Sequence, residues 1–436
     1  LEKTSRIYAG YGVLQTPRMF KKERRILMVN IGLLGLGTVG SGVYDIINKQ
    51  RVLFKNQLNK DIRIKKVLIK NMDKNRSVNI DRKLLTLNPK EILDDEEIDI
   101  VVDALSDREV AYNCIKYALE NNKHVTTASK AVVAPNLCEF QNLARQKEKA
   151  FLFEASVGGG IPIVNPLKQI AEVDNIFQIE GILNGTTNYI LTKMYEEELS
   201  FDIALNYAQE KGYAELDPTD DINGYDTARK LSILSTIAYG QKVNFDYIDC
   251  YGIDKIAVED IQAFKKINLI PKLIGKSKIK DGRIYASVEP VLVNKDSFFS
   301  NVIDAFNLVL LQGVNAGELH FYGQGAGKDP TANSIILDVF NIIKGIYKNE
   351  NVCINEVINK KKHLGFDGKY YFRFTFKNKK HLDLLLTDCT SYGEFKLIGE
   401  GKNVAIIFDW LLKRDVDKIV VKAKALDVDC FYSRIR

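Results

Sequence analysis

The chain has 436 residues, 46% hydrophobic and 27% charged, which is typical of a globular protein with about two to four domains. Its 62 basic and 56 acidic residues leave a net charge of +6, too small and too dispersed to indicate nucleic-acid binding. Six separated cysteines without a CxxC pair and four scattered histidines favour reduced thiols in a cytoplasm and argue against a metal site of His or Cys side chains.

The N-terminus carries a basic stretch, but no apolar region of signal-peptide type follows it. No apolar run in the sequence reaches the ~18 residues that a membrane helix needs, so no membrane partner is expected. Because Met28 directly precedes the first strong strand, residues 1–27 are interpreted as an upstream extension or a cloning remnant. An ordered first strand or arm is the alternative.

The segment VNIGLLGLGTVGSGVYDIINKQ (29–50) reads as a strand, a GxGxxG loop and a helix, the order that a dinucleotide-binding motif requires. The first glycine allows a tight turn, the second lets backbone approach a pyrophosphate, and the third lets helix and strand pack closely. The helix N-terminus offers free N–H groups to phosphates. A tight strand–helix turn without a ligand is the alternative. The candidate cofactor contacts are Gly35, Leu36, Gly37, Thr38, Val39 and Gly40.

The second expected strand is IRIKKVLIK (62–70). In NAD-binding proteins an acidic residue at the end of this strand binds the ribose 2′-hydroxyl. Here the strand ends at Lys70, Lys74 and Arg76 follow, and the first carboxylate is Asp73. Basic residues at this position favour a 2′-phosphate, so the sequence favours NADP, with NAD still possible. A solvated loop without a cofactor role is the alternative.

Residues 98–106 (IDIVVDALS) form a further buried strand, a helical stretch covers 109–121, and KHVTTASKAVVA (123–134) is expected to be a strand ending in Ser129-Lys130. Strands alternating with helices predict an α/β fold, with a Rossmann-like doubly wound parallel sheet over 28–155. Such sheets bind ligands at the carboxyl ends of their strands, where Ser106 and Lys130 lie. A lysine that points only to water is the alternative.

The middle of the chain begins with FLFEASVGGGIPIV (151–164), where three glycines let the backbone approach a ligand or an ion, or simply bend. QIEGILNGTTNYILTKM (178–194) then sets the run Asn-Gly-Thr-Thr-Asn between two apolar segments. Asn184-Gly185 indicates a turn, and Thr187 or Asn188 could cap a helix that begins near Tyr189. Capping explains one polar residue of this run but not all of them.

ELDPTDDINGYDTARK (215–230) gathers carboxylates and ends on two basic residues. Apolar residues at helical spacing over 225–240 predict a helix on which Asp226 and Lys230 share a face. One interpretation is a surface ion pair. The other is a charged pair aimed into a cleft, where a desolvated lysine can act as acid or base. The spacing alone favours the surface pair and leaves both open.

The last part of the chain starts with YGQGAGKDPTANSIILDVFNIIKGI (322–346), a Gly-rich turn followed by an amphipathic helix. Residues 347–368 read as a linker. Residues 369–436 read as strand, helix, strand, strand, helix, strand. This βαββαβ order fits a ferredoxin-like unit.

Four of these segments resemble the successive motifs of homoserine dehydrogenase: EASVGGGIPIV, ILNGTTNYILTKM, AELDPTDDINGYDTARKLSIL and FYGQGAGKDPTA. The similarity runs from about Val29 to about Ile346, and TASKAVVA resembles that family's strand ending in a lysine. The resemblance implies a cytoplasmic oxidoreductase of threonine, methionine and isoleucine biosynthesis. Its reaction would be the reversible NAD(P)H-dependent reduction of L-aspartate 4-semialdehyde to L-homoserine.

The resemblance also implies a domain plan: an α+β substrate-binding and dimerisation domain over 156–321, and a helix over 322–346 that returns to the nucleotide domain. Its implied partners are an amino-acid substrate and a second copy of the chain in a homodimer or higher oligomer. Lys230 matches the proton donor to the substrate carbonyl, and Lys130 matches the lysine between cofactor and substrate. Glu215 and Asp226 match the carboxylates that bind the amino end of the substrate, and Ser106 and Gly327 match further cofactor contacts. The family's sodium site, which consists mainly of backbone carbonyls, is matched by Glu154, Val157, Gly159 and Ile161.

Residues 369–436 resemble the ACT domain at the C-terminus of many bacterial homoserine dehydrogenases, where it often senses threonine. Amino-acid-binding ACT domains usually carry an Asp-x-x-Gly turn after the first strand, but this chain has Lys377-Asn-Lys-Lys380. A structural or dimer-forming role therefore competes with threonine feedback. Another Rossmann dehydrogenase and a non-catalytic amino-acid sensor are the alternative functions. The presence of Lys130 and Lys230 argues against the sensor.

Overall fold

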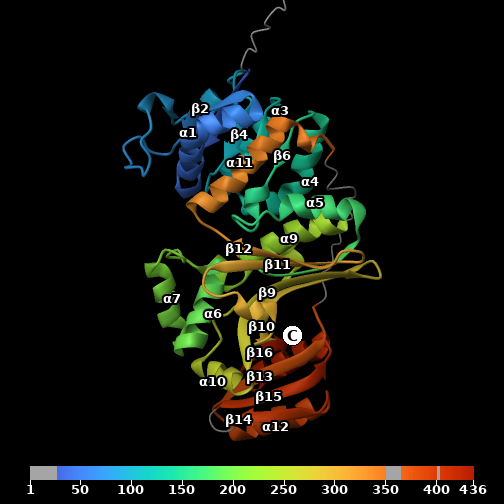
Figure 1. The fold of residues 1–436 in the computed structure, drawn as a ribbon. Coiled ribbons are helices and arrows are strands. Elements are labelled where there is room, and N and C mark those ends of the chain that lie inside the picture. The colour runs from blue at the N-terminus through green and yellow to red at the C-terminus, as the bar shows by residue number, and fades with distance from the viewer. Residues whose placement is uncertain (1–26, 350–364, 400–402) are drawn as a thin grey trace, which may run out of the picture.

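The computed structural model describes residues 27–349, 365–399 and 403–436, which form two β-sheets flanked by helices (Figure 1). The expected N-terminal extension lies outside the described residues except for Leu27, where the first strand begins. Most of the expected linker, residues 350–364, also lies outside them. No helix among the described residues is long and apolar enough to cross a membrane.

The first sheet is six-stranded and parallel, with the strand order β3-β2-β1-β4-β5-β6. This is the order of a doubly wound dinucleotide-binding sheet, so the predicted Rossmann-like fold is confirmed. The order reverses between β1 and β4, and ligands bind such sheets beyond the carboxyl ends of the strands at this point. Its strands are β1 (Leu27–Leu34), β2 (Lys60–Leu68), β3 (Leu85–Thr86), β4 (Ile100–Asp103), β5 (His124–Thr127) and β6 (Phe151–Leu152).

The helices of this sheet are α1 (Thr38–Leu58), α2 (Lys90–Leu93), α3 (Arg108–Glu120), α4 (Lys130–Gln146) and, from far along the chain, α11 (Lys328–Lys344). One boundary differs from the prediction, because the strand expected to end at Ser129-Lys130 ends at Thr127, and Lys130 is the first residue of α4. An apolar run such as Ala131–Ala134 suits either a strand or a helix. Here Val132 and Val133 both donate their N–H groups to the carbonyl of Ser129, which closes a first helical turn.

The second sheet begins with the strands of a mixed middle domain, whose order is β12-β11-β7-β9-β10. These strands are β7 (Ile176–Ile182), β9 (Leu269–Lys280), β10 (Arg283–Asn294), β11 (Phe306–Gly313) and β12 (Gly317–Gln324), with the short β8 (Asp249–Cys250) beside β10. The helices are α5 (Val164–Val173), α6 (Gly185–Glu197), α7 (Phe201–Glu210), α8 (Thr219–Ile222), α9 (Tyr225–Tyr239) and α10 (Val258–Lys266).

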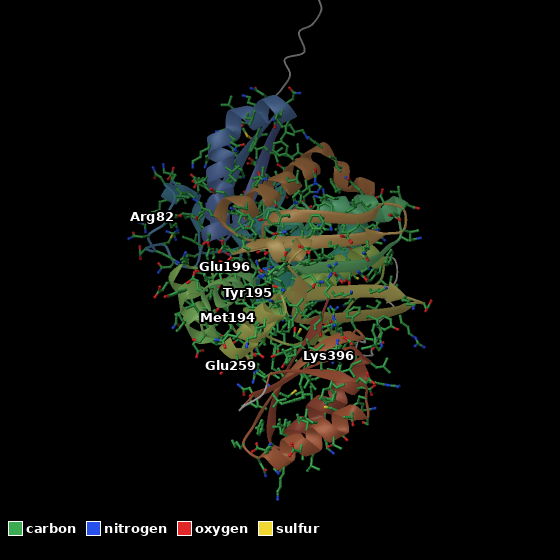
Figure 2. All side chains as sticks on the ribbon, turned by 60° about the horizontal axis from the view of Figure 1, so that its bottom comes forward. Arg82, Met194, Tyr195, Glu196, Glu259 and Lys396 are labelled. Carbon is green, nitrogen blue, oxygen red and sulfur yellow. The ribbon has the colours of Figure 1, made fainter. Side chains whose placement is uncertain are left out.

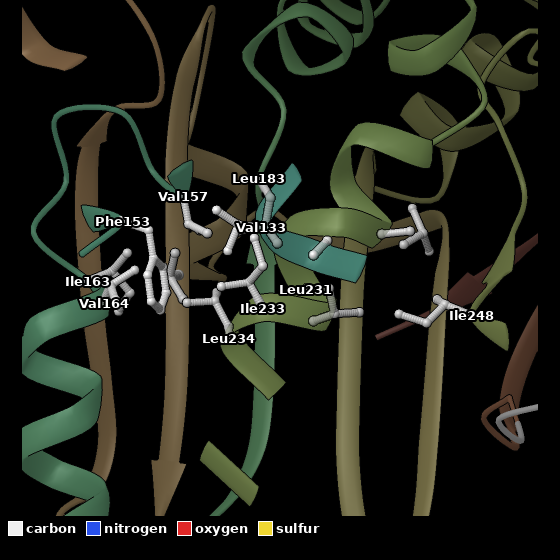
Figure 3. Close-up of a cluster of buried hydrophobic side chains, with 14 of the residues drawn as sticks. Val133, Phe153, Val157, Ile163, Val164, Leu183, Leu231, Ile233, Leu234 and Ile248 are labelled. Atoms are coloured by element: carbon white, nitrogen blue, oxygen red, sulfur yellow. The ribbon is translucent and has the colours of Figure 1, made fainter. Parts of the chain in front are cut away.

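Helix α9 is held from several sides. Its residues Leu231, Ile233 and Leu234 are fully buried, and Figure 3 shows them among side chains from α4 and from the segment that leads into α5. Gly224 turns the chain into this helix with a φ of +82°, and a Cβ there would lie 2.7 Å from Val288. The helix is therefore a fixed support for any polar side chain that it carries.

The C-terminal unit has four strands and two helices: β13 (Gly368–Phe376), α12 (Lys379–Thr390), β14 (Phe395–Gly399), β15 (Asn403–Leu411), α13 (Lys413–Ala425) and β16 (Val428–Ile435). The strand order β14-β15-β13-β16 is antiparallel, as the ferredoxin-like prediction requires. Strand β16 also pairs in parallel with β10, so this unit continues the sheet of the middle domain. Lys396 on β14 marks the unit in Figure 2.

Buried ion pairs fasten the C-terminal unit to the middle domain. The carboxylate of Asp260, on α10, accepts hydrogen bonds from the Arg373 guanidinium at 2.9 and 3.0 Å and from the Tyr371 hydroxyl at 2.8 Å. Glu289 on β10 accepts from Arg434 on β16 at 2.9 Å. A carboxylate this deeply buried needs a charged partner, so each pair depends on the other unit staying in place.

The expectation that every cysteine is a reduced thiol does not hold for one of them. Cys114, Cys250, Cys389 and Cys430 form no disulfide, whereas Cys138 is bonded in one. Cys353 lies outside the described residues. Among the described residues no group of three or more His, Cys, Asp and Glu side chains could hold a metal ion.

Candidate active site

The glycine loop has the geometry of a phosphate cradle. Gly35 has a φ of +96°, and a Cβ on it would lie 2.6 Å from the carbonyl oxygen of Ala104. A Cβ on Gly40 would lie 2.1 Å from the carbonyl oxygen of Gly35. A Cβ on Gly37, by contrast, would meet nothing within 4 Å, so the backbone there faces open space. Helix α1 begins at Thr38 without a side-chain cap, and its first N–H groups remain available to an anion.

The remaining members of this loop, Leu36 and Val39, are partly buried, while Thr38 is exposed. The loop starts where β1 ends beside β4, because Ala104 donates its N–H to the carbonyl of Leu34 at 2.8 Å. The backbone at Gly37 and the first N–H groups of α1 are therefore open to the pyrophosphate of a dinucleotide.

Lys70 and Ser106 lie on the same side of the sheet. The Lys70 side chain is 71% exposed, and its Nζ is 3.8 Å from the carboxylate of Asp107. Asp107 caps α3, and the exposed Ser106 directly precedes it. Arg76 donates instead to the backbone carbonyls of its own loop, including that of Lys74 at 2.8 Å. Of the basic residues predicted to favour NADP, Lys70 and Lys74 therefore have exposed side chains, whereas the guanidinium of Arg76 is engaged by its own loop.

Helix α11 and the glycine-rich segment before α5 come together beside the same sheet. Gly327 precedes α11 with a φ of +133°. A Cβ on Gly159 would lie 2.5 Å from the backbone of Gly325, so these two glycine loops are in direct contact. Helix α11 also packs along α1, which brings residues 328–344 back to the nucleotide-binding sheet (Figure 1).

Two lysines meet at one buried carboxylate. Asp226 binds Lys130 through Oδ1 at 2.9 Å and Lys230 through Oδ2 at 2.7 Å. Lys230 also donates to the backbone carbonyl of Leu183 at 2.7 Å. Asp226 is only 3% exposed and Lys230 only 8%. The pair Asp226–Lys230 is thus buried, and the surface interpretation that helical spacing favoured is wrong.

This cluster joins the two domains. Lys130 begins α4 just beyond the carboxyl end of β5, whereas Asp226 and Lys230 lie on α9 of the middle domain. Burial acts to raise the pKa of Asp226, but the charges of Lys230 and Lys130 outweigh it and hold that pKa well below its ordinary value. The charge of Asp226 in turn raises the pKa of Lys130. The carboxylate and Lys130 therefore remain ionised at neutral pH.

Two further residues, Asn184 and Asp221, complete the cluster. Asn184 donates through Nδ2 to Asp226 Oδ2 at 2.9 Å and to Asp221 Oδ1 at 2.7 Å. Its Oδ1 accepts from the N–H of Thr187 at 2.8 Å, so Asn184 itself caps α6, and the expected cap at Thr187 or Asn188 is wrong. Burial, and then the charge of Asp226, raises the pKa of Asp221. The unexplained length of the polar run around Asn184 was the available signal.

The other carboxylates of residues 215–230 lie toward solvent. Glu215 is exposed, and among the described residues its carboxylate makes no ion pair or hydrogen bond. Asp217 accepts from the Thr219 hydroxyl at 2.6 Å, and Asp220 pairs with Arg229 at 2.6 Å. Of the carboxylates in residues 215–230, Asp221 and Asp226 belong to the cluster.

The four residues matched to a sodium site lie in one segment between β6 and α5. The side chain of Glu154 is committed to the N-terminus of α5, where it accepts the N–H groups of Ile163, Val164 and Asn165 at 2.7 to 2.8 Å. The carbonyl of Gly159 accepts from the Ser334 hydroxyl at 2.7 Å. Val157 and Ile161 are buried in the hydrophobic core. A carbonyl has two lone pairs, so these bonds leave the backbone oxygens able to bind a cation.

Comparisons with known proteins agree with this geometry. A family model described as "Homoserine dehydrogenase, NAD binding domain" matches residues 35–154, and one described as "Homoserine dehydrogenase" matches residues 162–340. The homoserine dehydrogenase of Bacillus subtilis is 38% identical over 318 residues, which cover 73% of each chain. That of Synechocystis is 40% identical over 324 residues, which cover 73% of this chain and 74% of the relative.

Solved structures extend the likeness to the C-terminal unit. A homoserine dehydrogenase from Thiobacillus denitrificans superposes with a TM-score of 0.82 at 31% identity and covers 94% of this chain and 98% of that one. A hyperthermophilic archaeal homoserine dehydrogenase in complex with NADPH superposes with a TM-score of 0.61 at 26% identity, over 73% of this chain and 98% of that one. The chain therefore belongs to the homoserine dehydrogenase family and is an NAD(P)-dependent oxidoreductase.

Proposed function

We propose that Lys230 is the proton donor in the reversible reduction of L-aspartate 4-semialdehyde to L-homoserine. The observation that carries this assignment is the Lys130–Asp226–Lys230 bridge, which spans the two domains at the carboxyl edge of the nucleotide-binding sheet. A bound nicotinamide supplies the hydride. The protein must then supply a proton to the carbonyl oxygen.

The hydrogen bonds of Lys230 suit that task. A lysine ammonium has three N–H donors, and two of them are engaged by Asp226 and by the carbonyl of Leu183. One donor is left for a substrate oxygen. In the reverse direction the amine of Lys230 would accept the proton from the homoserine hydroxyl.

The substrate is a zwitterion and needs both signs of charge. Lys130 provides a fixed positive charge between cofactor and substrate, and we assign the amino end of the substrate to Glu215 and the Asp226 region. Asp221 is a further carboxylate of the cluster, since Asn184 links it to Asp226. The role of Glu215 is assigned from the family motif. Its side chain is exposed in the structure.

NADP is the proposed cofactor, with NAD possible. Gly35, Leu36, Gly37, Thr38, Val39 and Gly40 would hold the pyrophosphate, and Lys70, Ser106, Lys130 and Gly327 would supply further contacts. An exposed lysine at the end of β2 suits the 2′-phosphate of NADP. A clearly higher kcat/KM with NAD than with NADP would contradict this assignment.

A sodium ion bound mainly by backbone carbonyls of Glu154, Val157, Gly159 and Ile161 belongs to the same proposal. Asp338 lies beside this segment, since its side chain accepts the N–H of Glu154 at 3.0 Å. Replacing sodium by choline should then lower the thermal stability. Equal melting temperatures in the two salts would contradict the proposed sodium site.

At the level of the whole chain, the proposal is a cytoplasmic homodimer or higher homo-oligomer formed through the middle domain, with residues 369–436 acting as an ACT-like unit. Sedimentation equilibrium would report the oligomeric state. Initial rates with and without threonine would report whether the C-terminal unit confers feedback, which Lys377–Lys380 in place of the Asp-x-x-Gly turn argues against.

The decisive experiment concerns Lys230. Lys230→Ala should abolish most NADPH-dependent turnover of aspartate semialdehyde, since the carbonyl loses its proton donor, while NADPH still binds. Full activity in this variant would overturn the assignment. Substrate-dependent NADPH oxidation by the unmodified protein also separates this reaction from that of another Rossmann dehydrogenase acting on a different small aldehyde.

A further inference from the structure

The side chain of Asn184 uses all of its hydrogen-bonding groups within the candidate active site. Its Oδ1 accepts from Thr187, and its two amide protons go to Asp221 at 2.7 Å and Asp226 at 2.9 Å. Asn184 is 4% exposed, so water does not substitute for these partners. A side-chain amide has two donors, and both are therefore spent on carboxylates.

The chemistry of this clamp suits asparagine alone among residues of its size. Two neighbouring carboxylates repel each other, and burial followed by the charge of Asp226 raises the pKa of Asp221. A neutral donor between them stabilises both charges without adding a third cation to the two lysines. Aspartate would have the same shape but no donor, and serine would have one donor in place of two.

The backbone next to Asn184 has a related task. The carbonyl of Leu183 accepts from Lys230 at 2.7 Å, and Lys230 also binds Asp226 Oδ2, the oxygen that Asn184 bonds. Residues 183 and 184 thus fix the lysine from one side and its carboxylate partner from the other. Because Asn184 also caps α6, this arrangement is tied to a helix terminus.

The carboxylates then differ in what they can still bind. Asp226 already accepts from Lys130, Lys230 and Asn184, whereas among the described residues Asp221 accepts only from Asn184. Asp221 is partly exposed and Asp226 is not. Asp221 is accordingly the carboxylate with a free oxygen for the ammonium group of an amino-acid substrate.

We propose that Asn184 is a positioning residue that keeps Asp221 ionised and aimed at the substrate's ammonium group while it holds Asp226 against Lys230. This inference rests on the proposed function, because it assumes an amino-acid substrate and Lys230 as the proton donor. It adds a division of roles within the Asp226 region, in which Asp226 holds the two lysines and Asp221 joins Glu215 at the amino end of the substrate.

The test compares Asn184→Asp with Asn184→Ser. Both variants keep an oxygen that can cap α6, so both should fold and bind NADPH as the unmodified protein does. Asn184→Asp loses both donors and Asn184→Ser loses at least one. The KM for aspartate semialdehyde should rise about 10- to 100-fold, the range expected when hydrogen bonds to a charged group are lost.

The pH profile separates positioning from a merely structural role. Without its donor Asp221 should take up a proton more readily, so the acid limb of kcat/KM should move to higher pH, and further for Asn184→Asp than for Asn184→Ser. A matched control is Asn378→Asp, the same change at the cap of α12, where Asn378 bonds the N–H of Lys380 and no carboxylate. This control should leave KM and the acid limb unchanged.

The outcomes are distinguishable. An unchanged KM and acid limb in both Asn184 variants would overturn the positioning role, even with the proposed function intact. Full activity of Lys230→Ala, or no turnover of aspartate semialdehyde by the unmodified protein, would instead overturn the proposed function. A variant that fails to bind NADPH would show that Asn184 acts through the fold and would also overturn the proposal.

Discussion

Replacing Asp226 by asparagine would remove the one negative charge that lies between two lysines. Asp226 is 3% exposed, and the side chain of Lys230 is 10% exposed. Losing one member of so buried a pair costs about 3–5 kcal/mol, because the remaining ammonium stays buried without its partner. The side chain of Lys130 is 39% exposed, so water screens its charge. Loss of the Lys130–Asp226 ion pair therefore costs less than about 1 kcal/mol of stability.

The same substitution should disrupt catalysis more than cofactor binding. Lys230 would keep its bond to the carbonyl of Leu183 but lose the carboxylate that orients it, and misplacing a reacting group by about 1 Å costs about 100-fold in rate. Urea unfolding would measure the loss of stability from the transition midpoint, and steady-state rates with NADPH would measure kcat. The affinity for NADPH should change little.

A matched control is Asp220→Asn on the same segment. Asp220 pairs with Arg229 at 2.6 Å but is 62% exposed, so this change should cost no more than about 1 kcal/mol and leave kcat alone. Adding Lys130→Met to Asp226→Asn should recover part of the lost stability, because it removes one of two facing cations, without recovering the rate. Equal effects of Asp226→Asn and Asp220→Asn on both measurements would refute the reasoning.

Three further outcomes follow from the geometry. Gly37→Ala should fold normally, since its Cβ meets nothing within 4 Å. It should nevertheless weaken NADPH binding, measured by fluorescence titration, and unaltered binding would contradict the phosphate-binding role of the loop. Burial and the nearby Glu154 raise the pKa of Asp338 from 3.8 to about 8, so the folded state binds an extra proton between these values. The melting temperature should therefore fall as the pH rises through that window, and Asp338→Asn should flatten the slope. Arg373→Met leaves Asp260 buried without its guanidinium and should cost about 3–5 kcal/mol in urea unfolding, whereas Lys377→Met, at an exposed pair, should be nearly neutral.

Much of the fold could be read from local pattern. The strand, glycine loop and helix over residues 29–50 appear as β1 and α1, and the βαββαβ order of residues 369–436 appears element by element. Such elements depend on the spacing of apolar residues and on glycines that the backbone requires, and both are visible in a short window of sequence. The boundary after Thr127 was wrong because a short apolar run carries no period of its own.

Only part of the candidate site could be predicted from local sequence patterns. The motifs pointed to Lys130, Asp226 and Lys230, but helical spacing could not tell whether Asp226 and Lys230 lie at the surface or in the interior. That depends on what covers the helix, and α9 is covered by segments far away in the sequence (Figure 3). The clamp formed by Asn184 joins residues 37 and 42 positions apart, so no local pattern contains it.

The sequence by itself determined the family motifs, the nucleotide-binding loop and the kinds of element along the chain, because these depend on contacts within about one supersecondary unit. The tertiary structure alone decided that one carboxylate bridges Lys130 and Lys230 across two domains, and that β16 extends the sheet of the middle domain. Burial and partner distance set the charge state of such groups, and both arise only when distant segments pack together.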